Sequence, residues 1–241
     1  MPITLGQIEA IFRYPVKSMR GESLDAATLG WHGLDGDRRL AFRRLEGQGG
    51  FPWLNASKLP ELVLFTPQGR EERNGDVLPT HVLTPEGETL PVFGDALAAE
   101  IGRRHGAPVQ MLHLRNGIFD DASISVITSD TIREISRLAE ESPDVRRFRP
   151  NLLVRSTRAI PFEEDEWMGG VLAFGEPDGA AVTVTVRDVR CAIVNIDPDR
   201  GSITPVVLKA VVRANENNAG VYGTVTRAGR LAVGQTVFLH R

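Results

Sequence analysis

The sequence contains very little cysteine: Cys191 is the only one among 241 residues. One thiol cannot form a disulfide within the chain, and it cannot alone hold an iron-sulfur cluster or a zinc site of the multi-cysteine type. The five histidines show no spacing typical of metal ligands. Any metal bound here therefore has at most one sulfur ligand from the protein.

Long apolar runs and an excess of basic charge are also missing. No stretch reaches the length of a membrane span, and Gln7 and Glu9 have no basic region ahead of them, so we expect a cytoplasmic protein with no membrane partner. The net charge of -3 argues against a nucleic-acid partner. With 41% apolar and 24% charged residues, the whole chain should fold.

Glycines and prolines recur between short apolar runs, which is the pattern of many short strands joined by turns. We therefore predict a mainly β (α+β) fold. The clearest strand covers residues 182–189, where Val182, Val184 and Val186 should face one way. The other predicted strands are 3–12, 39–43, 62–66, 109–114, 123–127, 152–155, 208–212, 221–226 and 236–240.

Two segments have helical periodicity instead. Asp95 suits the start of a helix that ends at His105, and Ser129 suits the start of a second that ends before Pro143. The polar segment 67–79 is predicted to be an exposed loop.

A strand and helix unit begins again at Asp120, so we place a domain boundary near Gly117. The predicted domains are residues 1–117 and 118–241.

Cys191 is the first candidate for chemistry. Arg190 precedes it directly and Arg187 lies four positions earlier, at the end of a predicted strand. Neighbouring guanidinium charge favours the thiolate, which binds soft metals or acts as a nucleophile. The alternative, a buried structural cysteine that acts as a small apolar side chain, is the more frequent case for a lone cysteine.

Basic residues in two other segments of the chain are suited to binding an anion. Lys17 and Ser18 follow a proline turn, and their ammonium and hydroxyl groups together suit a phosphate, although a solvated lysine is the simpler interpretation. Arg38 and Arg39 begin a predicted strand, where alternation should send one inward. An inward arginine needs either a structural aspartate or an anionic ligand as its partner.

The segment RRFRPN contains three more arginines. Arg146 and Arg147 suit an exposed basic turn, whereas Arg149, between Phe148 and Pro150, is a candidate for a binding site, with Asn151 beside it.

The carboxylates form no convincing acid and base pair. Asp120 and Asp121 precede Ser123, and the acids at 163–166 are typical of an exposed loop.

Taken in order along the chain, several segments resemble the MOSC family, which is named for the C-terminal domain of molybdenum cofactor sulfurases. Within it they are most similar to the two-part proteins typified by the amidoxime-reducing component. The N-terminal segments are YPVKSMRGESLDAATLGWHGLDGDR and LPEL. The C-terminal segments are FDDASISVITSDTI, RFRPNLLV, FEEDEW, VRDVRCAIVNIDPDRG and GRLAVGQTVFL.

The resemblance implies an N-terminal β-barrel-like domain followed by a MOSC β-barrel with a few peripheral helices. It also implies a bound molybdenum cofactor (molybdopterin with molybdenum), with no role for pyridoxal phosphate. Cys191 matches the metal ligand, and Cys191 and Asp121 are the implied catalytic residues. The implied cofactor-binding residues are Lys17, Ser18, Arg38, Ser123, Arg149, Asn151, Arg190 and Cys191.

The implied function is an oxidoreductase that reduces N-hydroxylated small molecules and takes its electrons from a separate flavin or iron-sulfur reductase. A different class remains open, in which Cys191 serves a carrier that transfers the cofactor or sulfur to another enzyme. Two departures from the family pattern, Ser57 where many relatives have arginine and Val189 where the mitochondrial members have serine, leave the substrate undetermined.

Overall fold

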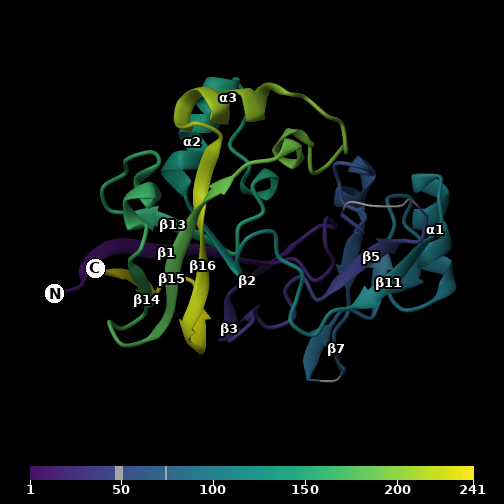
Figure 1. The fold of residues 1–241 in the computed structure, drawn as a ribbon, viewed down its shortest axis with the longest axis horizontal. Helices are drawn as coiled ribbons and strands as arrows, with labels where there is room; N and C mark the ends of the chain where they lie inside the picture. The colour runs from purple at the N-terminus through teal and green to yellow at the C-terminus, as the bar shows by residue number, and fades with distance from the viewer. Residues whose placement is uncertain (47–50, 74) are drawn as a thin grey trace.

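The central feature of the fold is a closed β-barrel. The computed structural model describes residues 1–46, 51–73 and 75–241. Seven strands form a ring in the order β13-β12-β16-β15-β14-β18-β1, which closes because β1 also pairs with β13 (Figure 1). Their bounds are β1 Ile3–Arg13, β12 Ile124–Thr128, β13 Leu152–Ser156, β14 Val171–Phe174, β15 Ala180–Val189, β16 Asn218–Arg227 and β18 Thr236–His240.

The strand that closes this barrel comes from the N-terminal end of the chain. β1 pairs antiparallel with both β13 and β18, and its Leu5, Ile8 and Ile11 are buried in the barrel core. Two β-bulges in β1 let it turn between these partners. Residues 118–241 therefore do not complete the barrel without β1, although the boundary near Gly117 itself stays a prediction.

Three helices accompany the strands in the described residues: α1 (Asp95–His105), α2 (Ser129–Ala139) and α3 (Val206–Asn215). α2 and α3 pack against each other on the outside of the barrel (Figure 1). The side chain of Thr128 caps α2 by accepting from the Thr131 amide, 3.2 Å away.

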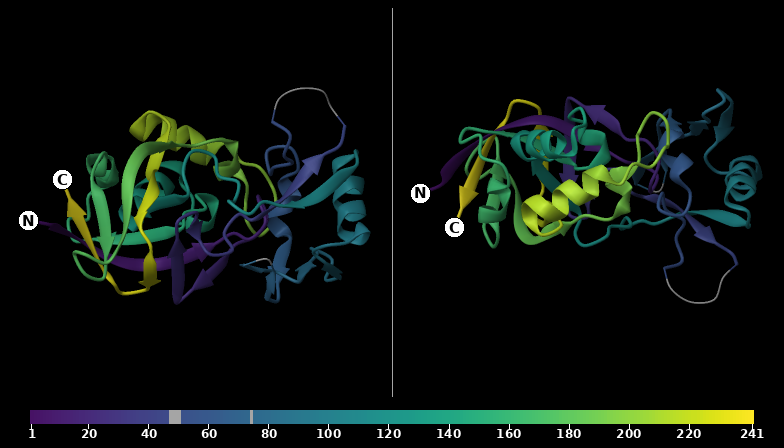
Figure 2. Two further views of the ribbon diagram at one scale, coloured as in Figure 1. Left: turned by 60° about the horizontal axis from the view of Figure 1, so that its bottom comes forward. Right: turned by 90° about the horizontal axis from the view of Figure 1, so that it is seen from above.

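A second body, beside the barrel, is built from short sheets and α1 around its own apolar core (Figure 2). Its strands are β5 (Leu40–Arg44) with β11 (Val109–His113), β6 (Thr66–Gln68), β9 (His81–Leu83) and β10 (Thr89–Pro91), and the hairpin β7 (Glu71–Arg73) with β8 (Asp76–Leu78). The remaining strands, β2 (Glu22–Leu24), β3 (Ala26–Gly30), β4 (Gly33–Leu34) and β17 (Gly229–Ala232), lie nearer the barrel.

The mainly β fold with a few helices is confirmed, and four local predictions are wrong. Residues 208–212 lie in α3, and residues 62–64 of the strand predicted at 62–66 lie in a 3-10 helix, Pro60–Leu64. Segment 67–79 contains the β7–β8 hairpin and is not simply a loop, although its Asn74 lies outside the described residues. Val186 is 36% exposed, because a register shift after Val184 interrupts the alternation in β15.

The acidic segment 163–166 also differs from the prediction, because two of its carboxylates are buried. Glu164 accepts hydrogen bonds from the hydroxyls of Thr128 and Thr131, at 2.9 and 3.0 Å, beside the start of α2.

Within the part of the chain that the structure describes, no helix is long and apolar enough to cross a membrane.

Candidate functional site

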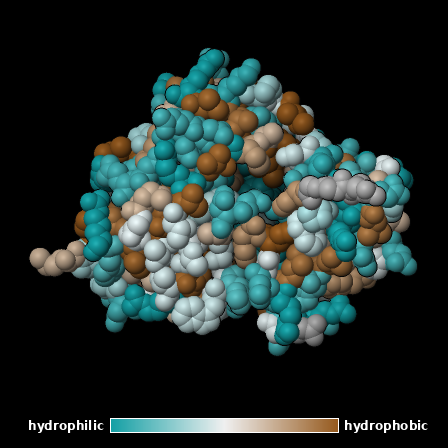
Figure 3. All heavy atoms as spheres, in the orientation of Figure 1, coloured by the Kyte–Doolittle hydropathy of each residue, from teal (hydrophilic) through white to brown (hydrophobic). Residues whose placement is uncertain are grey.

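A cavity of about 380 Å³ lies between the two bodies. Figure 3 shows the surface hollowed where the two bodies meet. The cavity is lined by the segment after β1, the loop before the first 3-10 helix, the segments before β12 and β13, the end of β15 and Tyr222 in the middle of β16. Seven of the predicted residues line it: Lys17, Ser18, Arg38, Asp121, Arg149, Arg190 and Cys191.

Cys191 follows β15 directly and lies in the wall of this cavity. Its side chain is exposed, so it is not the buried structural cysteine that the sequence left open. The backbone at Cys191 is extended, and a short 3-10 helix, Ala192–Asn195, begins after it. The thiol is therefore open to a ligand in the cavity.

Lys17 and Ser18, in the segment that follows β1, line the cavity. The Lys17 ammonium lies 2.9 Å from Asp120 and 5.6 Å from the centre of the Phe51 ring, so it is paired and not simply solvated. Ser18 has a left-handed backbone, φ 68°, and its hydroxyl oxygen accepts a hydrogen bond of 3.0 Å from the Ala56 amide. The hydroxyl hydrogen remains free to donate.

The pKa of Asp120 depends on these cations. Desolvation acts to raise the pKa of Asp120, but the Lys17 ammonium, with Arg38 and Arg149, lowers it below its ordinary value. Asp120 is thus held as a carboxylate beside Lys17. An anionic ligand that binds Lys17 has to compete with it.

Arg38 is fixed by a buried carboxylate that sequence reasoning missed. Asp37 is fully buried, and its oxygens accept from the Arg38 guanidinium at 2.5 Å and from the Tyr14 amide at 2.7 Å. Burial acts to lower the pKa of Arg38, but Asp37, together with Tyr222 and Tyr14, raises it above its ordinary value. The DGD turn was the available signal for Asp37.

The alternation predicted for Arg38 and Arg39 is wrong, since both side chains are largely buried. Arg38 has a left-handed backbone, φ 51°, and precedes β5, so strand alternation does not apply to it. Arg39 is held by Asp76 at 3.1 Å and points away from the cavity lining.

Arg149 lines the cavity without a close carboxylate partner in the described part of the chain. Among the described residues no carboxylate oxygen lies within 4.0 Å of it, and its guanidinium donates to the carbonyl of Met19 at 2.7 Å and lies 4.2 Å from the Tyr14 ring centre. Burial lowers the pKa of Arg149 to about 10, since the partial negative charge of Tyr14 only partly offsets it and Arg38 adds to it. An anion here would relieve this unfavourable burial.

Arg190 and Arg187 do not surround the thiol as the sequence suggested. The Arg190 guanidinium is buried and donates to the carbonyls of Ala219 and Phe148, both at 2.7 Å, while it pairs with Asp188 at 2.8 Å. Arg187 pairs with Asp165 at 2.9 Å and lies outside the cavity lining. Arg190 therefore supports the wall of the cavity.

Two predicted residues, Asn151 and Ser123, do not line the cavity. Asn151 is buried behind it, where its amide donates to Asp37 at 3.0 Å and its oxygen accepts from Arg38 at 3.3 Å. It therefore acts on the cavity by positioning Arg38. The Ser123 hydroxyl oxygen is buried and has no hydrogen-bond partner in the described part of the chain.

Asp188 and Tyr222 line the cavity and were not found from the sequence. Burial raises the pKa of Asp188 to about 6, against the effects of Arg190 and of a 3.1 Å hydrogen bond from Ser125. Burial and the neighbouring Asp188 also raise the pKa of Tyr222 above its ordinary value. Asp188 lies on the buried face with Val182 and Val184, as alternation along β15 predicts, but nothing in the sequence singled it out as a cavity residue.

The side chains of this cavity fit a metal ion that is bound mainly by an anionic organic cofactor. Among the described residues no group of three or more histidine, cysteine or acidic side chains could hold a metal ion. One exposed thiol, however, shares the cavity with two lysines and three arginines: Lys17, Lys58, Arg38, Arg149 and Arg190. Ser57 and the largely exposed Val189, the two departures from the family pattern, also line it.

Residues 101–238 match the MOSC domain, and residues 5–114 match the MOSC N-terminal beta barrel domain. No curated protein matches the chain. The crystal structure of the YuaD protein from Bacillus subtilis aligns with 15% identity and a TM-score of 0.54, over 100% of this chain and 97% of that one. At this identity the likeness shows the fold alone.

The crystal structure of YiiM from Geobacillus stearothermophilus aligns over 49% of this chain and 54% of that one, with 18% identity and a TM-score of 0.39. The assignment comes from the domain matches, which extend over both bodies and the candidate cavity. The chain belongs to the MOSC family, whose domain is associated with molybdenum cofactor binding in general.

Proposed function

We propose that the cavity between the two bodies holds a molybdenum cofactor, with Cys191 as the metal ligand, and that the protein reduces N-hydroxylated small molecules. One observation carries this proposal. Cys191 is exposed in the same cavity as Lys17, Arg38 and Arg149, which come from distant parts of the chain. A soft thiolate ligand and a set of cations are what an anionic dithiolene cofactor needs.

The cations divide into two kinds. Lys17, with the Ser18 hydroxyl, and Arg38 would hold the phosphate end, since a flexible ammonium and a fixed guanidinium both bind phosphate oxygens. Arg149 has no carboxylate partner among the described residues, so its charge is available to the cofactor. Asn151 and Asp37 would keep Arg38 in place before and after binding.

When bound, the cofactor would supply electron-transfer chemistry for the substrate. Reduction of a hydroxylamine to an amine consumes two electrons and two protons and releases water. The electrons would come from a separate flavin or iron-sulfur reductase. Asp121, an exposed carboxyl group in the cavity lining, is our candidate for proton delivery.

Metal analysis of the purified protein tests the ligand assignment. Cys191→Ala should lose most of its molybdenum, because the only thiol of the chain is gone, while its fold should persist because the thiol is exposed. Thr185→Ala, an exposed change on β15, the strand that precedes Cys191, is the matched control and should keep the metal. Equal molybdenum in all three proteins would refute the assignment.

The reaction needs a separate test. The molybdenum-loaded protein, given a reduced viologen dye, should convert benzamidoxime to benzamidine. If Cys191→Ala loses the metal but the loaded wild-type protein shows no turnover, the cofactor site stands and the proposed reaction is rejected.

The exposure of Cys191 also favours a second function, that of a carrier that passes the cofactor to another enzyme. Gel filtration distinguishes the two functions. An enzyme should retain its molybdenum through the column, whereas a carrier should release it to an added apoenzyme.

A further inference from the structure

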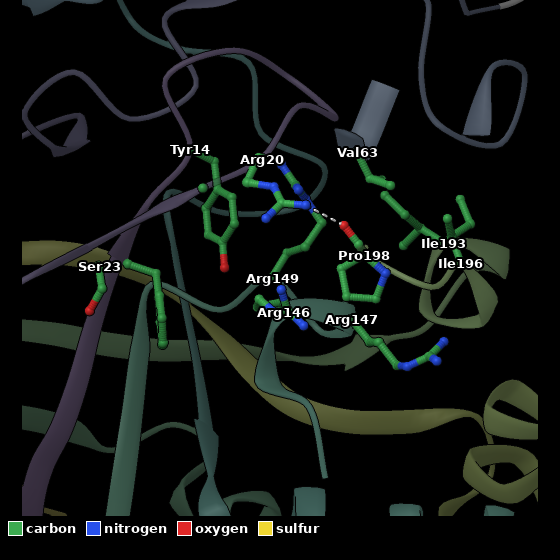
Figure 4. Close-up of a pocket in the computed structure, with 12 residues that line it drawn as sticks. Tyr14, Arg20, Ser23, Val63, Arg146, Arg147, Arg149, Ile193, Ile196 and Pro198 are labelled. Carbon is green, nitrogen blue, oxygen red and sulfur yellow. Dashed lines mark hydrogen bonds between the residues drawn. The ribbon is translucent and has the colours of Figure 1, made fainter. Parts of the chain in front are cut away.

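A second cavity, of about 220 Å³, lies on the other side of Arg149 and Ile193, which line both cavities. Figure 4 shows Tyr14, Arg20 and Arg149 gathered on one side, with Val63, Ile193, Ile196 and Pro198 opposite them. Neither Cys191 nor Lys17 lines this cavity. It is therefore distinct from the proposed cofactor site.

Among the described residues, the lining of the second cavity has no carboxylate and has four arginines: Arg20, Arg146, Arg147 and Arg149. Arg146 is fully compensated, because Asp144 and Asp199 lie 2.8 and 2.7 Å from its guanidinium. The other three are not. A cavity of this composition has a net positive lining.

Arg20 and Arg147 are only partly satisfied. Arg20 donates through one amino group to the carbonyl of Pro198 at 2.8 Å and to Asp199 at 3.3 Å, a carboxylate that Arg146 shares, and its Nε atom is buried with no hydrogen-bond partner in the described residues. The Arg147 side chain is only 9% exposed, although we predicted an exposed turn, and its carboxylate neighbours are 3.9 and 4.0 Å away. A buried guanidinium group such as that of Arg147, with its carboxylates this distant, is costly unless an anion compensates it.

The rest of the lining is apolar. Phe12, Val63, Ile193 and Ile196 contribute hydrocarbon, and the buried ring of Tyr14 adds an aromatic face. A free inorganic anion would leave this surface uncovered, whereas a purely apolar ligand would leave the guanidinium groups unpaired. The lining matches a ligand that has both parts.

We infer that this second cavity binds a small organic anion, one with an apolar or aromatic body and a phosphate or carboxylate head. The head pairs with Arg20 and Arg147, and with the face of Arg149 that the cofactor does not use. The body lies against the apolar wall on the side of Ile193 and Ile196. This site goes beyond the proposed function, because it does not depend on the metal or on Cys191.

Calorimetric titration with phenyl phosphate tests the inference on the intact protein. We expect saturable binding with one site per chain, and weaker binding of inorganic phosphate, which lacks the apolar body. The Arg20→Gln/Arg147→Gln double variant should bind phenyl phosphate about tenfold more weakly or worse, because charge-assisted hydrogen bonds are lost. Lys17→Ala, which alters only the cofactor cavity, should bind it as well as the wild type does.

A second pair of variants tests the inference independently, in case the double variant misfolds. Ser23 is an exposed residue in the lining of the second cavity, so Ser23→Trp should block the cavity and abolish binding, whereas Ser23→Ala should not. Thermal melting checks that each variant is folded. Phenyl phosphate binding that survives in Ser23→Trp, or that disappears in Lys17→Ala, would assign the ligand to the other cavity and overturn the inference.

Discussion

Asp37 is the residue on which the arrangement of the cofactor cavity depends most. It is fully buried and compensates Arg38, and it also accepts from the Tyr14 amide and the Asn151 side chain. One carboxylate thus links the segment after β1 to the start of β13. Removing its charge without changing its shape isolates this role.

We predict that Asp37→Asn lowers the free energy of unfolding by about 3 kcal/mol, because it leaves the buried Arg38 charge without its carboxylate. Urea denaturation followed by circular dichroism measures the change. Glu134→Gln is the control, since Glu134 only pairs with the exposed Arg137 within α2, and it should change little. A similar small effect for Asp37→Asn would mean that Arg38 finds compensation elsewhere.

Asp188 predicts a dependence of stability on pH. Burial raises its pKa to about 6, against the effect of Arg190, whereas in the unfolded chain the value is about 4. The folded state therefore binds the Asp188 carboxyl proton more tightly than the unfolded chain does. Protonation of Asp188 stabilises the fold by roughly 2–3 kcal/mol below pH 4, and this contribution is lost as the pH rises to about 6.

Asp188→Asn should remove this dependence while it keeps an acceptor for Arg190 and Ser125. We expect the unfolding free energy of the wild type to fall relative to that of Asp188→Asn between pH 4 and pH 6. Denaturation curves of both proteins at several pH values give the difference. A difference that does not change with pH would contradict the raised pKa.

The sequence singled out the thiol and most of the cations that line the cavity, because residues such as Lys17 and Arg149 lie in turns next to strands, and their binding roles stay predictions. It did not single out Asp188, although alternation places it on the buried face with Val182 and Val184. The left-handed backbone of Arg38 broke the alternation expected there. The partner of Arg38, which the sequence left open between an aspartate and a ligand, is Asp37 in this structure.

Among the elements, β1 is constrained most closely at Gly6, where it changes register. An added Cβ at Gly6 would lie 2.0 Å from the carbonyl oxygen of Arg155 in β13. This oxygen belongs to the backbone, so it cannot move without breaking the pairing of β1 with β13. Gly94, before α1, has the same φ of 158° but no heavy atom within 4 Å of such a Cβ.

We predict that Gly6→Ala destabilises the protein by about 3 kcal/mol or more, because the clash opens the barrel. Gly94→Ala should cost much less, since it shares the backbone conformation and lacks the clash. Thermal melts of the two variants make a matched comparison. Equal melting temperatures would show that the barrel tolerates a shift of β1.

The errors in element prediction have a common cause. The segment LKAVV has β-branched residues that favour a strand, yet Val207, Ala210 and Val211 are buried at helical spacing in α3, against α2. At residues 60–64 the proline in the first turn is compatible with a helix start, and a 3-10 helix forms there. Packing against neighbours decided both cases, and single-sequence propensity does not contain that information.

At the scale of the whole molecule, the two bodies are not successive halves of the chain. β1 closes the barrel that residues 118–241 otherwise form, and Leu29 and Leu34 add to the same core. Both cavities lie where the segment after β1 passes from the barrel to the second body. The sites therefore depend on the way the chain crosses between the bodies.

This arrangement predicts the behaviour of fragments. Residues 118–241 alone should not fold cooperatively, because β13 and β18 would each lose the strand that pairs with them. β1 and β18 are antiparallel, with Ile3 opposite Leu239, so a short glycine-rich linker can join Arg241 to Met1 as a hairpin. A fragment that runs from 118 to 241 and then, through this linker, from 1 to 34 contains all seven barrel strands and the two core leucines.

We expect this rearranged fragment to show a cooperative thermal transition in near-ultraviolet circular dichroism and the plain 118–241 fragment to show none. The same rearranged fragment with Ile8→Asp provides the control, since a charge at this buried position of β1 should abolish the transition. A cooperative transition of the plain fragment at the same temperature would mean that β13 and β18 close the barrel by themselves, and that β1 is an addition to a domain already complete.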